Sequence, residues 1–305
     1  MINVSVVVPI YNGEADLPGL IDCLRSQTYP SDQVEYLLVD NNSSDRTVEM
    51  LQTLATDSIR PLSENQIQSS YAARNEGIRQ AQGSIVAFTD ADCRPEPQWL
   101  EELVKPFEDE AVGIVVGEIV ALPGDTLLER HADRQDTLSQ KHTIAHSFLP
   151  YGQTANLAVR RSIFEQVGLF RPYLTTGGDA DICWRIQQQT AYKVYFAQNA
   201  ILKHRHRSTL QELRSQWRRY GKSNRYLHEL HGIELTRDFK TKDYIYRLGR
   251  WLLKELPINS VKAIAQKADI VDILNTPIDL WNVQARCQGQ KQAKLPPEAE
   301  KIEQL

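Results

Sequence analysis

The stretch VAFTDADCRPEPQWL, residues 86–100, runs from an apolar segment into two carboxylates one residue apart, Asp90 and Asp92. A short continuous apolar run is typical of a strand buried on both faces of a parallel sheet. Open α/β sheets bind ligands at the carboxyl ends of such strands, and a D-x-D turn offers hard oxygen ligands that suit Mg²⁺ or Mn²⁺. The stretch therefore predicts an α/β protein with a ligand site. The alternative is a solvated turn in which an aspartate caps the next helix.

Two earlier segments repeat this alternation of strand and helix. An apolar run at residues 4–10 precedes a stretch with helical spacing, and a second run at 35–40 ends at Asp40. A helix is expected from about Asp45 with Ser44 as its N-cap, and another up to Gly83 as its C-cap. Asp40 and Asp90 are therefore expected at equivalent places, the carboxyl ends of two parallel strands.

The rest of the chain predicts further α/β structure and then helices. Strands are expected near 113–122, 155–160 and 192–197, with a long loop containing some helix at 124–150 and a Gly-rich turn opening a helix at 175–189. Helices follow at 208–230, 244–256 and 259–275, the last two separated by Pro257. The expected domains are 1–232, a helical extension at 233–288 and a disordered tail at 289–305.

Composition limits the functional classes. A formal net charge of −4 argues against a general polyanion binder. The four cysteines include no C-x-x-C pair, which favours reduced thiols over a zinc site or a disulfide framework. The apolar runs are too short to span a bilayer, and no basic leader follows Met1, so we expect a cytoplasmic protein that at most lies on the inner face of a membrane.

Six segments, in this order, resemble the family-2 glycosyltransferases of the GT-A fold. They are VSVVVPIYNGE, YLLVDNNSSDRT, ARNEGI, GSIVAFTDADC, GQTANLAVRRSIFEQVGLF and GGDADICWRI, and the resemblance covers about residues 3–230. It implies a Rossmann-like, mostly parallel sheet flanked by helices, with a C-terminal helical extension. It also implies transfer of a sugar, with inversion, from a nucleoside diphosphate to an acceptor hydroxyl, in synthesis of a polysaccharide, glycolipid or other cell-envelope glycan. UDP is the commonest donor base in the family, and GDP and dTDP are alternatives.

The resemblance also implies roles for single residues. Asp179 matches the general base, and Gly178 stands where relatives usually have Glu. Asp181 is a supporting carboxylate, expected with Trp99 at the acceptor, whereas Trp184 is expected in the core.

A divalent cation, Mn²⁺ or Mg²⁺, is implied at the D-x-D turn. Asp92 is expected to bind it directly, Asp90 through water or by contact with the ribose, and His204 to complete the site, with His206 as a competing candidate. The residues matched to the donor nucleotide are Pro9, Tyr11, Asn12, Glu14, Asp40, Arg74 and Asp90. For Tyr11 the alternative is a core aromatic, and for Arg74 an exposed helical salt bridge.

Residues 203–225 carry eight basic residues against the single acid Glu212. Three interpretations remain open: contact with anionic membrane lipid or a lipid-diphosphate acceptor, a clamp on the donor phosphates, or a solvated helix face paired with acids elsewhere. The expected partners are the sugar nucleotide and a sugar or lipid-linked acceptor, with no nucleic acid.

Two other functions stay open. A catalytically inactive protein that binds sugar nucleotides is compatible with Gly178 in place of Glu. A sugar nucleotidyltransferase would need a Gly-rich, Lys-bearing phosphate loop after the first strand, and PIYNGEADL has only Gly13. A glycoside hydrolase is less compatible, because its two acids would face each other across a cleft.

Overall fold

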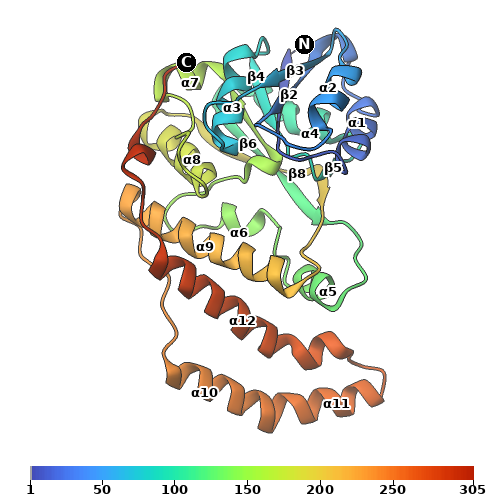
Figure 1. Cartoon of the computed structure of the whole chain (residues 1–305), viewed down its shortest axis with the longest axis vertical. Coiled ribbons are helices and arrows are strands. Elements are labelled where there is room, and N and C mark those ends of the chain that lie inside the picture. Colours follow the sequence, from blue (N-terminus) through green and yellow to red (C-terminus); the bar gives the residue numbers. More distant parts are fainter. Residues whose placement is uncertain (1) are drawn as a thin grey trace. The chain divides into compact units, whose positions relative to one another are not determined.

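The computed structural model describes residues 2–305 and forms two compact units (Figure 1). The first contains the chain up to Val120, Leu138–His204 and Pro296–Leu305. The second contains Ala121–Thr137 and Arg205–Leu295. This division differs from the expected boundaries. Residues 121–137 belong to the helical unit, and residues 296–305 belong to the sheet unit.

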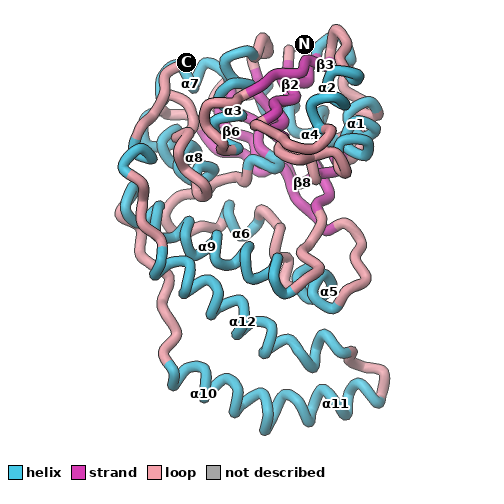
Figure 2. The backbone as a smooth tube through the Cα atoms, in the orientation of Figure 1, coloured by secondary structure: helices cyan, strands magenta, loops and turns pink. Residues whose placement is uncertain are grey.

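The first unit is built on an eight-stranded sheet in the order β3-β2-β1-β4-β7-β6-β8-β5 (Figure 2). Strands β1, β2, β3 and β4 run parallel, whereas β7 is antiparallel to β4 and β6, and β5 is antiparallel to β8. The predicted α/β class is confirmed, with a mixed sheet. The strands are β1 Val4–Ile10, β2 Val34–Asp40, β3 Ile59–Ser63, β4 Ile85–Phe88, β5 Cys93–Pro95, β6 Val112–Ala121, β7 Leu157–Arg160 and β8 Lys193–His204.

The apolar runs form the central strands β1 and β4, which are buried in the sheet unit. Every residue of β4 is buried, as are all residues of β1 except Pro9. In the register of β1 and β2, Ile10 lies opposite Asp40, so the loops that follow both strands start side by side. The helices of this unit are α1 Leu17–Arg25, α2 Thr47–Leu54, α3 Ser70–Gln80, α4 Trp99–Val104, α6 Lys141–Ile144, α7 Arg161–Val167 and α8 Gly178–Gln189.

Two predicted helix caps are wrong. Helix α2 begins at Thr47, and the carboxylate of Asp45 rather than Ser44 accepts the Thr47 N–H, at 3.0 Å. Helix α3 ends at Gln80, and Gly83 lies beyond it, where its N–H donates to Ser5 Oγ at 2.8 Å. A Cβ at Gly83 would stand 2.5 Å from the backbone nitrogen of Ser5, so this glycine permits close packing of the loop on β1.

The second unit is helical, with α5 Leu127–Arg134, α9 Leu210–His231, α10 Thr241–Arg250, a π-helical turn Trp251–Glu255, α11 Leu256–Ile264 and α12 Ile270–Gln292. Helices α9 and α12 approach closely through two glycines. A Cβ at Gly221 would stand 1.9 Å from the carbonyl oxygen of Arg286, and one at Gly289 would stand 2.0 Å from that of Arg218. None of the described helices is long and apolar enough to cross a bilayer.

Two predictions about the C-terminal region are wrong. Pro257 does not separate two helices, because the π-helical turn Trp251–Glu255 continues directly into α11, and the break comes instead between Ile264 and Ile270. The tail is not disordered: Glu303 bonds to Arg79 at 2.5 Å and to Asn75 at 3.1 Å, and its carbonyl accepts the Leu169 N–H. These contacts could not be predicted from the sequence, because the tail has a polar composition and binds through polar groups of the sheet unit.

Candidate active site

The carboxyl end of β2 holds an ionisable side chain with an unfilled bonding position. Asp40 is 4% exposed, and its Oδ2 accepts the Ser43 N–H at 3.3 Å. Its Oδ1 is buried and has no hydrogen-bond partner among the described residues. A buried acceptor without a partner costs about 1–3 kcal/mol, so this oxygen is well placed for a donor group of a ligand.

The loops after β1 and β2 bind each other. Asn12 has a left-handed backbone, φ 50°, and its Oδ1 accepts the Ser44 N–H at 2.8 Å. Glu14 pairs with Arg46, whose Nε donates to it at 2.8 Å. These hydrogen bonds and this pair hold the two loops together at the carboxyl ends of β1 and β2. Pro9 is half-buried at the end of β1.

Tyr11 is 57% exposed, so the core-aromatic alternative is wrong and its ring is open to a ligand.

An ion pair between a buried arginine and a half-buried aspartate connects α3 with the D-x-D turn. Arg74 is 3% exposed, and its Nη2 lies 2.5 Å from Oδ1 of Asp90. The exposed salt bridge considered for Arg74 is therefore wrong. Its Nε is buried without a hydrogen-bond partner in the described part of the chain. The guanidinium thus holds Asp90 and keeps one donor for an anionic oxygen.

Asp92 and His204 come together through strand pairing. Cys93 on β5 lies opposite His204 on β8, and this register brings His204 Nε2 to 3.2 Å from Asp92 Oδ2. Potential ligand atoms of Asp92, Cys93 and His204 all lie within 4.8 Å of one another. Burial raises the pKa of the Cys93 thiol well above its ordinary value, so the carboxylate and the imidazole are the ligands that suit Mn²⁺ or Mg²⁺. His206 does not belong to this cluster.

Asp179 lies in the first turn of α8 and is half-buried. Burial raises its pKa, whereas the positive charge of Arg74 and a hydrogen bond from Thr154 Oγ1, at 2.8 Å, lower it. Asp90 also acts on its charge and raises the pKa. The carboxylate of Asp179 is thus electrostatically coupled to the Arg74–Asp90 pair. A carboxylate with a raised pKa is a suitable proton acceptor.

The glycine that departs from the family pattern has a structural reason. A Cβ at Gly178 would stand 2.7 Å from Cζ of Tyr71, so no larger side chain fits without moving that ring. The Tyr71 hydroxyl accepts the Gly178 N–H at 3.0 Å, and the guanidinium of Arg74 lies 5.6 Å from the ring centroid. Tyr71 therefore takes the space of the missing Glu side chain. It was not singled out from the sequence, and neither was Thr154; no chemical motif marks either residue.

Two predicted acceptor contacts are wrong. Trp99 is fully buried, and its indole N–H donates to Asn156 Oδ1 at 2.7 Å. Asp181 is also fully buried and pairs with Arg171 and Arg185, each at 3.0 Å. Neither side chain is accessible to an acceptor. A buried charge is costly unless it is paired, and both oxygens of Asp181 have arginine partners. Asp181 therefore ties α8 to the segment that contains Arg171. Trp184 lies in the core as predicted.

The basic segment 203–225 is partly used in packing. Arg214 donates to Gln288 at 3.2 Å, and Arg218 donates to Gln292 at 2.5 Å. Arg225 donates to the carbonyl of Gln290 at 3.3 Å. Three of its basic residues therefore bind neutral groups of α12. Two basic residues also pair with acids, Lys203 with Glu96 and Arg225 with Glu229, which supports the interpretation of a face paired with acids for these two residues only.

The chain is similar to known glycosyltransferases. The family model described as "Glycosyl transferase family 2" matches residues 5–173. A glycosyltransferase of Haloferax volcanii, AglE, is 36% identical over 255 residues, which are 82% of this chain and 80% of that protein. An undecaprenyl-phosphate 4-deoxy-4-formamido-L-arabinose transferase of Pectobacterium carotovorum is 34% identical over 155 residues, 49% of this chain and 46% of that protein.

Solved structures agree in fold. The mannosyltransferase PcManGT of Pyrobaculum calidifontis, solved with GDP-Man and Mn²⁺, superposes with a TM-score of 0.64 and 19% identity over 95% of this chain and 87% of that one. This likeness confirms the expected α/β fold of the GT-A type. Together with the match over residues 5–173, it leads to one conclusion: the chain belongs to glycosyl transferase family 2.

Proposed function

We propose that this protein transfers a sugar, with inversion, from a nucleoside diphosphate donor to an acceptor hydroxyl in cell-envelope glycan or glycolipid synthesis. UDP is the proposed base, as the family resemblance implies, and GDP is the alternative that the ligand of PcManGT suggests. The acceptor is proposed to be a sugar or a lipid-linked group, because one relative is named for action on undecaprenyl phosphate.

One observation carries the proposal: the Tyr71 ring contacts both Arg74, which pairs with Asp90 at the D-x-D turn, and the start of α8 at Gly178, next to Asp179. A base and an anion-binding arginine thus lie within electrostatic reach of each other in one site. This arrangement fits a reaction in which a proton leaves an incoming hydroxyl while negative charge develops on a departing diphosphate.

The proposed chemistry assigns each group one task. The unpartnered Oδ1 of Asp40 accepts the imino N–H of the base, and Tyr11 packs against the base. Asp179 accepts the proton of the acceptor hydroxyl while that oxygen bonds to C1 of the sugar. The bond between C1 and the diphosphate oxygen breaks, and its electron pair leaves with the nucleoside diphosphate. Arg74 interacts with the phosphate charge.

The donor set fits a divalent cation. Asp92 and His204 would hold it, with Asp90 in reach through water, and the ion would supply Lewis-acid stabilisation of the leaving diphosphate.

Titration calorimetry tests the donor site. UDP, GDP, dTDP and their common sugars are titrated, with Mn²⁺ and then with EDTA, into wild type, Asp92→Ala and the matched control Asp57→Ala. The Asp57 carboxylate is exposed elsewhere in the sheet unit. One nucleoside diphosphate is expected to bind wild type and the control in the presence of metal. Asp92→Ala is expected to lose this binding. If the folded protein binds none of them, the transferase proposal fails.

Turnover separates the enzyme from an inactive binding protein. Asp179→Asn is expected to keep donor binding and to lower the rate of donor hydrolysis or transfer by about 10²–10⁴-fold, the usual contribution of a general base. If wild type binds the donor but neither hydrolyses it nor transfers its sugar to any acceptor of a panel, the protein is an inactive sugar-nucleotide binder instead.

A further inference from the structure

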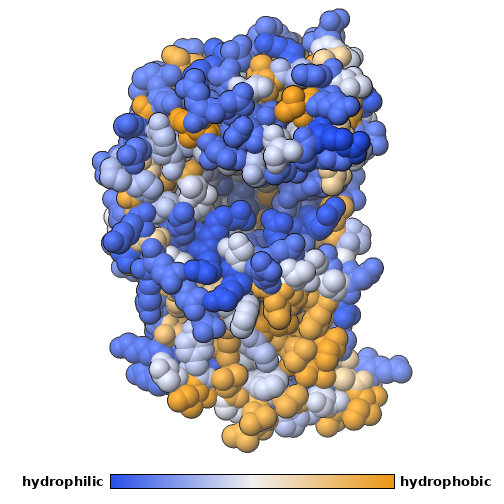
Figure 3. Space-filling model, in the orientation of Figure 1, coloured by the Kyte–Doolittle hydropathy of each residue, from blue (hydrophilic) through white to orange (hydrophobic). Residues whose placement is uncertain are grey.

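The segment formed by α10, the π-helical turn and α11, residues 241–264, exposes its apolar side chains. No residue of it is buried. Leu253 is 81% exposed and Ile264 is 86% exposed. Apolar side chains gather where Figure 1 draws these helices (Figure 3). The exposed large apolar residues are Ile245, Tyr246, Leu248, Leu252, Leu253, Ile258, Val261 and Ile264. A contiguous apolar patch of this kind marks an interaction surface.

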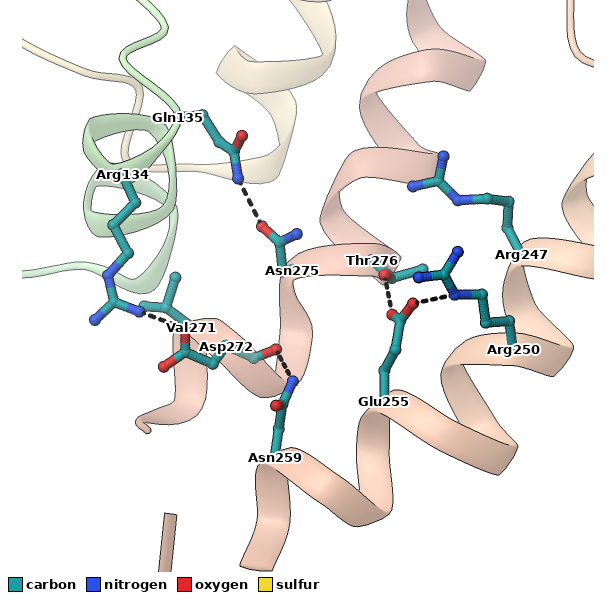
Figure 4. Close-up of a pocket in the computed structure, with 10 residues that line it drawn as sticks. All are labelled: Arg134, Gln135, Arg247, Arg250, Glu255, Asn259, Val271, Asp272, Asn275 and Thr276. Carbon is teal, nitrogen blue, oxygen red and sulfur yellow. Dashed lines mark hydrogen bonds and ion pairs between the residues drawn. The ribbon is translucent and has the colours of Figure 1, made fainter. Parts of the chain in front are cut away.

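The half-buried side of the same segment is mixed, with Tyr244, Trp251 and Leu256 beside polar residues that bond to α12. Trp251 donates its N–H to the carbonyl of Ile273 at 2.8 Å, and Asn259 donates to that of Asp272 at 2.9 Å. Glu255 bonds to Thr276 at 2.5 Å and to Arg250 at 2.9 Å, at the edge of a cavity of about 650 Å³ (Figure 4).

A helix on the surface of a water-soluble domain normally turns its apolar stripe inward and its polar face outward. Here Ile245, Leu248 and Leu252 recur at helical spacing on the exposed side, whereas Arg247 and Trp251 occupy the half-buried side. Many apolar side chains of the segment thus face outward, as in helices that lie on a membrane.

Charge selects between possible partners. Residues 240–267 hold seven basic and two acidic side chains, although the whole chain carries −4. Every exposed charged residue in this range is a cation, whereas Asp243 and Glu255 are half-buried and paired with Arg237 and Arg250. In a symmetric pair of copies the same patch meets itself, so these cations would repel one another. An anionic surface neutralises them.

We propose that the outward face of residues 241–264 lies on an anionic lipid bilayer surface. The apolar side chains enter the boundary between head groups and acyl chains, and the lysines and arginines contact lipid phosphates. The proposal goes beyond the transfer reaction and does not depend on it, because binding is measured without donor or acceptor. It also moves the expected membrane contact from the basic segment 203–225 to α10 and α11.

Vesicle sedimentation tests the proposal on the full chain. Wild type is expected to sediment with vesicles of phosphatidylcholine and phosphatidylglycerol in equal parts, and much less with phosphatidylcholine alone. The double variant Leu253→Glu, Ile264→Glu removes two apolar contacts and adds two repelled charges, so its affinity is expected to fall by at least about tenfold. The matched control Tyr195→Glu changes a 49% exposed residue of β8 and is expected to bind as wild type does.

Both changed positions in the double variant are over 80% exposed, so the fold is expected to survive, as far-UV circular dichroism and a thermal melt verify. Lys254→Gln, Lys262→Gln is expected to weaken binding to the anionic vesicles only. Raising the salt from 0.1 M to 0.5 M is expected to have the same effect, because it shortens the Debye length by about twofold. Light scattering reports oligomer size in each case.

Three results overturn the proposal: wild type that does not bind anionic vesicles, a double variant that binds as wild type does, or binding equal on the two vesicle types. A dimer that the double variant dissociates, without vesicle binding, identifies a second copy as the occupant instead.

Discussion

Replacing Thr154 by valine is expected to move the acid limb of the activity profile to higher pH. The Thr154 hydroxyl is buried and donates to Asp179 Oδ1 at 2.8 Å, which stabilises the ionised carboxylate. A hydrogen bond to a charged group contributes about 1.5–3 kcal/mol, and a pKa change of one unit corresponds to about 1.4 kcal/mol. Because the base must be ionised to accept a proton, its loss should move the limb upward by about one to two pH units.

The assay is kcat/KM for sugar transfer as a function of pH, with donor and acceptor below saturation. Thr190→Val is the control, because it makes the same substitution at the other end of α8, where the hydroxyl donates to the carbonyl of Ile186. Valine matches threonine in shape, so packing is largely kept. If Thr154→Val is folded and its acid limb is unchanged, while Thr190→Val is as active as wild type, Asp179 is not the titrating base.

Three further outcomes follow from single contacts. Gly178→Ala places a Cβ 2.7 Å from the Tyr71 ring, and it should lower the unfolding free energy by about 1–3 kcal/mol in urea titrations; unchanged stability would contradict the close contact. Asp179→Asn should raise the melting temperature at neutral pH, because burial raises the pKa of Asp179 and makes its charge costly; the gain should vanish as pH falls and the wild-type carboxyl is protonated, and a gain that persists in acid would exclude this cause. Deletion of residues 301–305 removes the bonds of Glu303 to Asn75 and Arg79, and calorimetry should show a lower melting temperature rather than the unchanged value expected of a disordered tail.

The parallel half of the fold is predictable because its signal is local. Continuous β-branched runs such as residues 4–10 have few alternatives to a buried strand, and β1 occupies these residues in the structure. The helix ends are less predictable. Ser44 and Gly83 are both good capping residues by type, yet tertiary hydrogen bonds to Asn12 and Ser5 use them elsewhere. Contacts between distant segments thus override local preference.

The candidate site is predictable where chemistry leaves a motif. The D-x-D turn and the aspartate that ends β2 follow from residue type and position, and the pairing of Asp92 with His204 follows the resemblance. Burial is not visible in a motif, so Trp99 and Asp181 were assigned to the acceptor although both lie in the interior. Tyr71 and Thr154 carry no motif, because each acts on Asp179 or its neighbour through packing or one hydrogen bond.

The Gly178 departure from the family pattern changes how the start of α8 is held. A carboxylate at that position would add a negative charge beside Asp179 and so make its ionisation harder. Tyr71 instead adds a neutral ring that supports Arg74 and a hydroxyl that accepts the Gly178 N–H. Burial raises the pKa of Asp179, and the charge of Arg74 and the hydrogen bond from Thr154 lower it. The Thr154→Val measurement therefore removes one of the two groups that favour the ionised base.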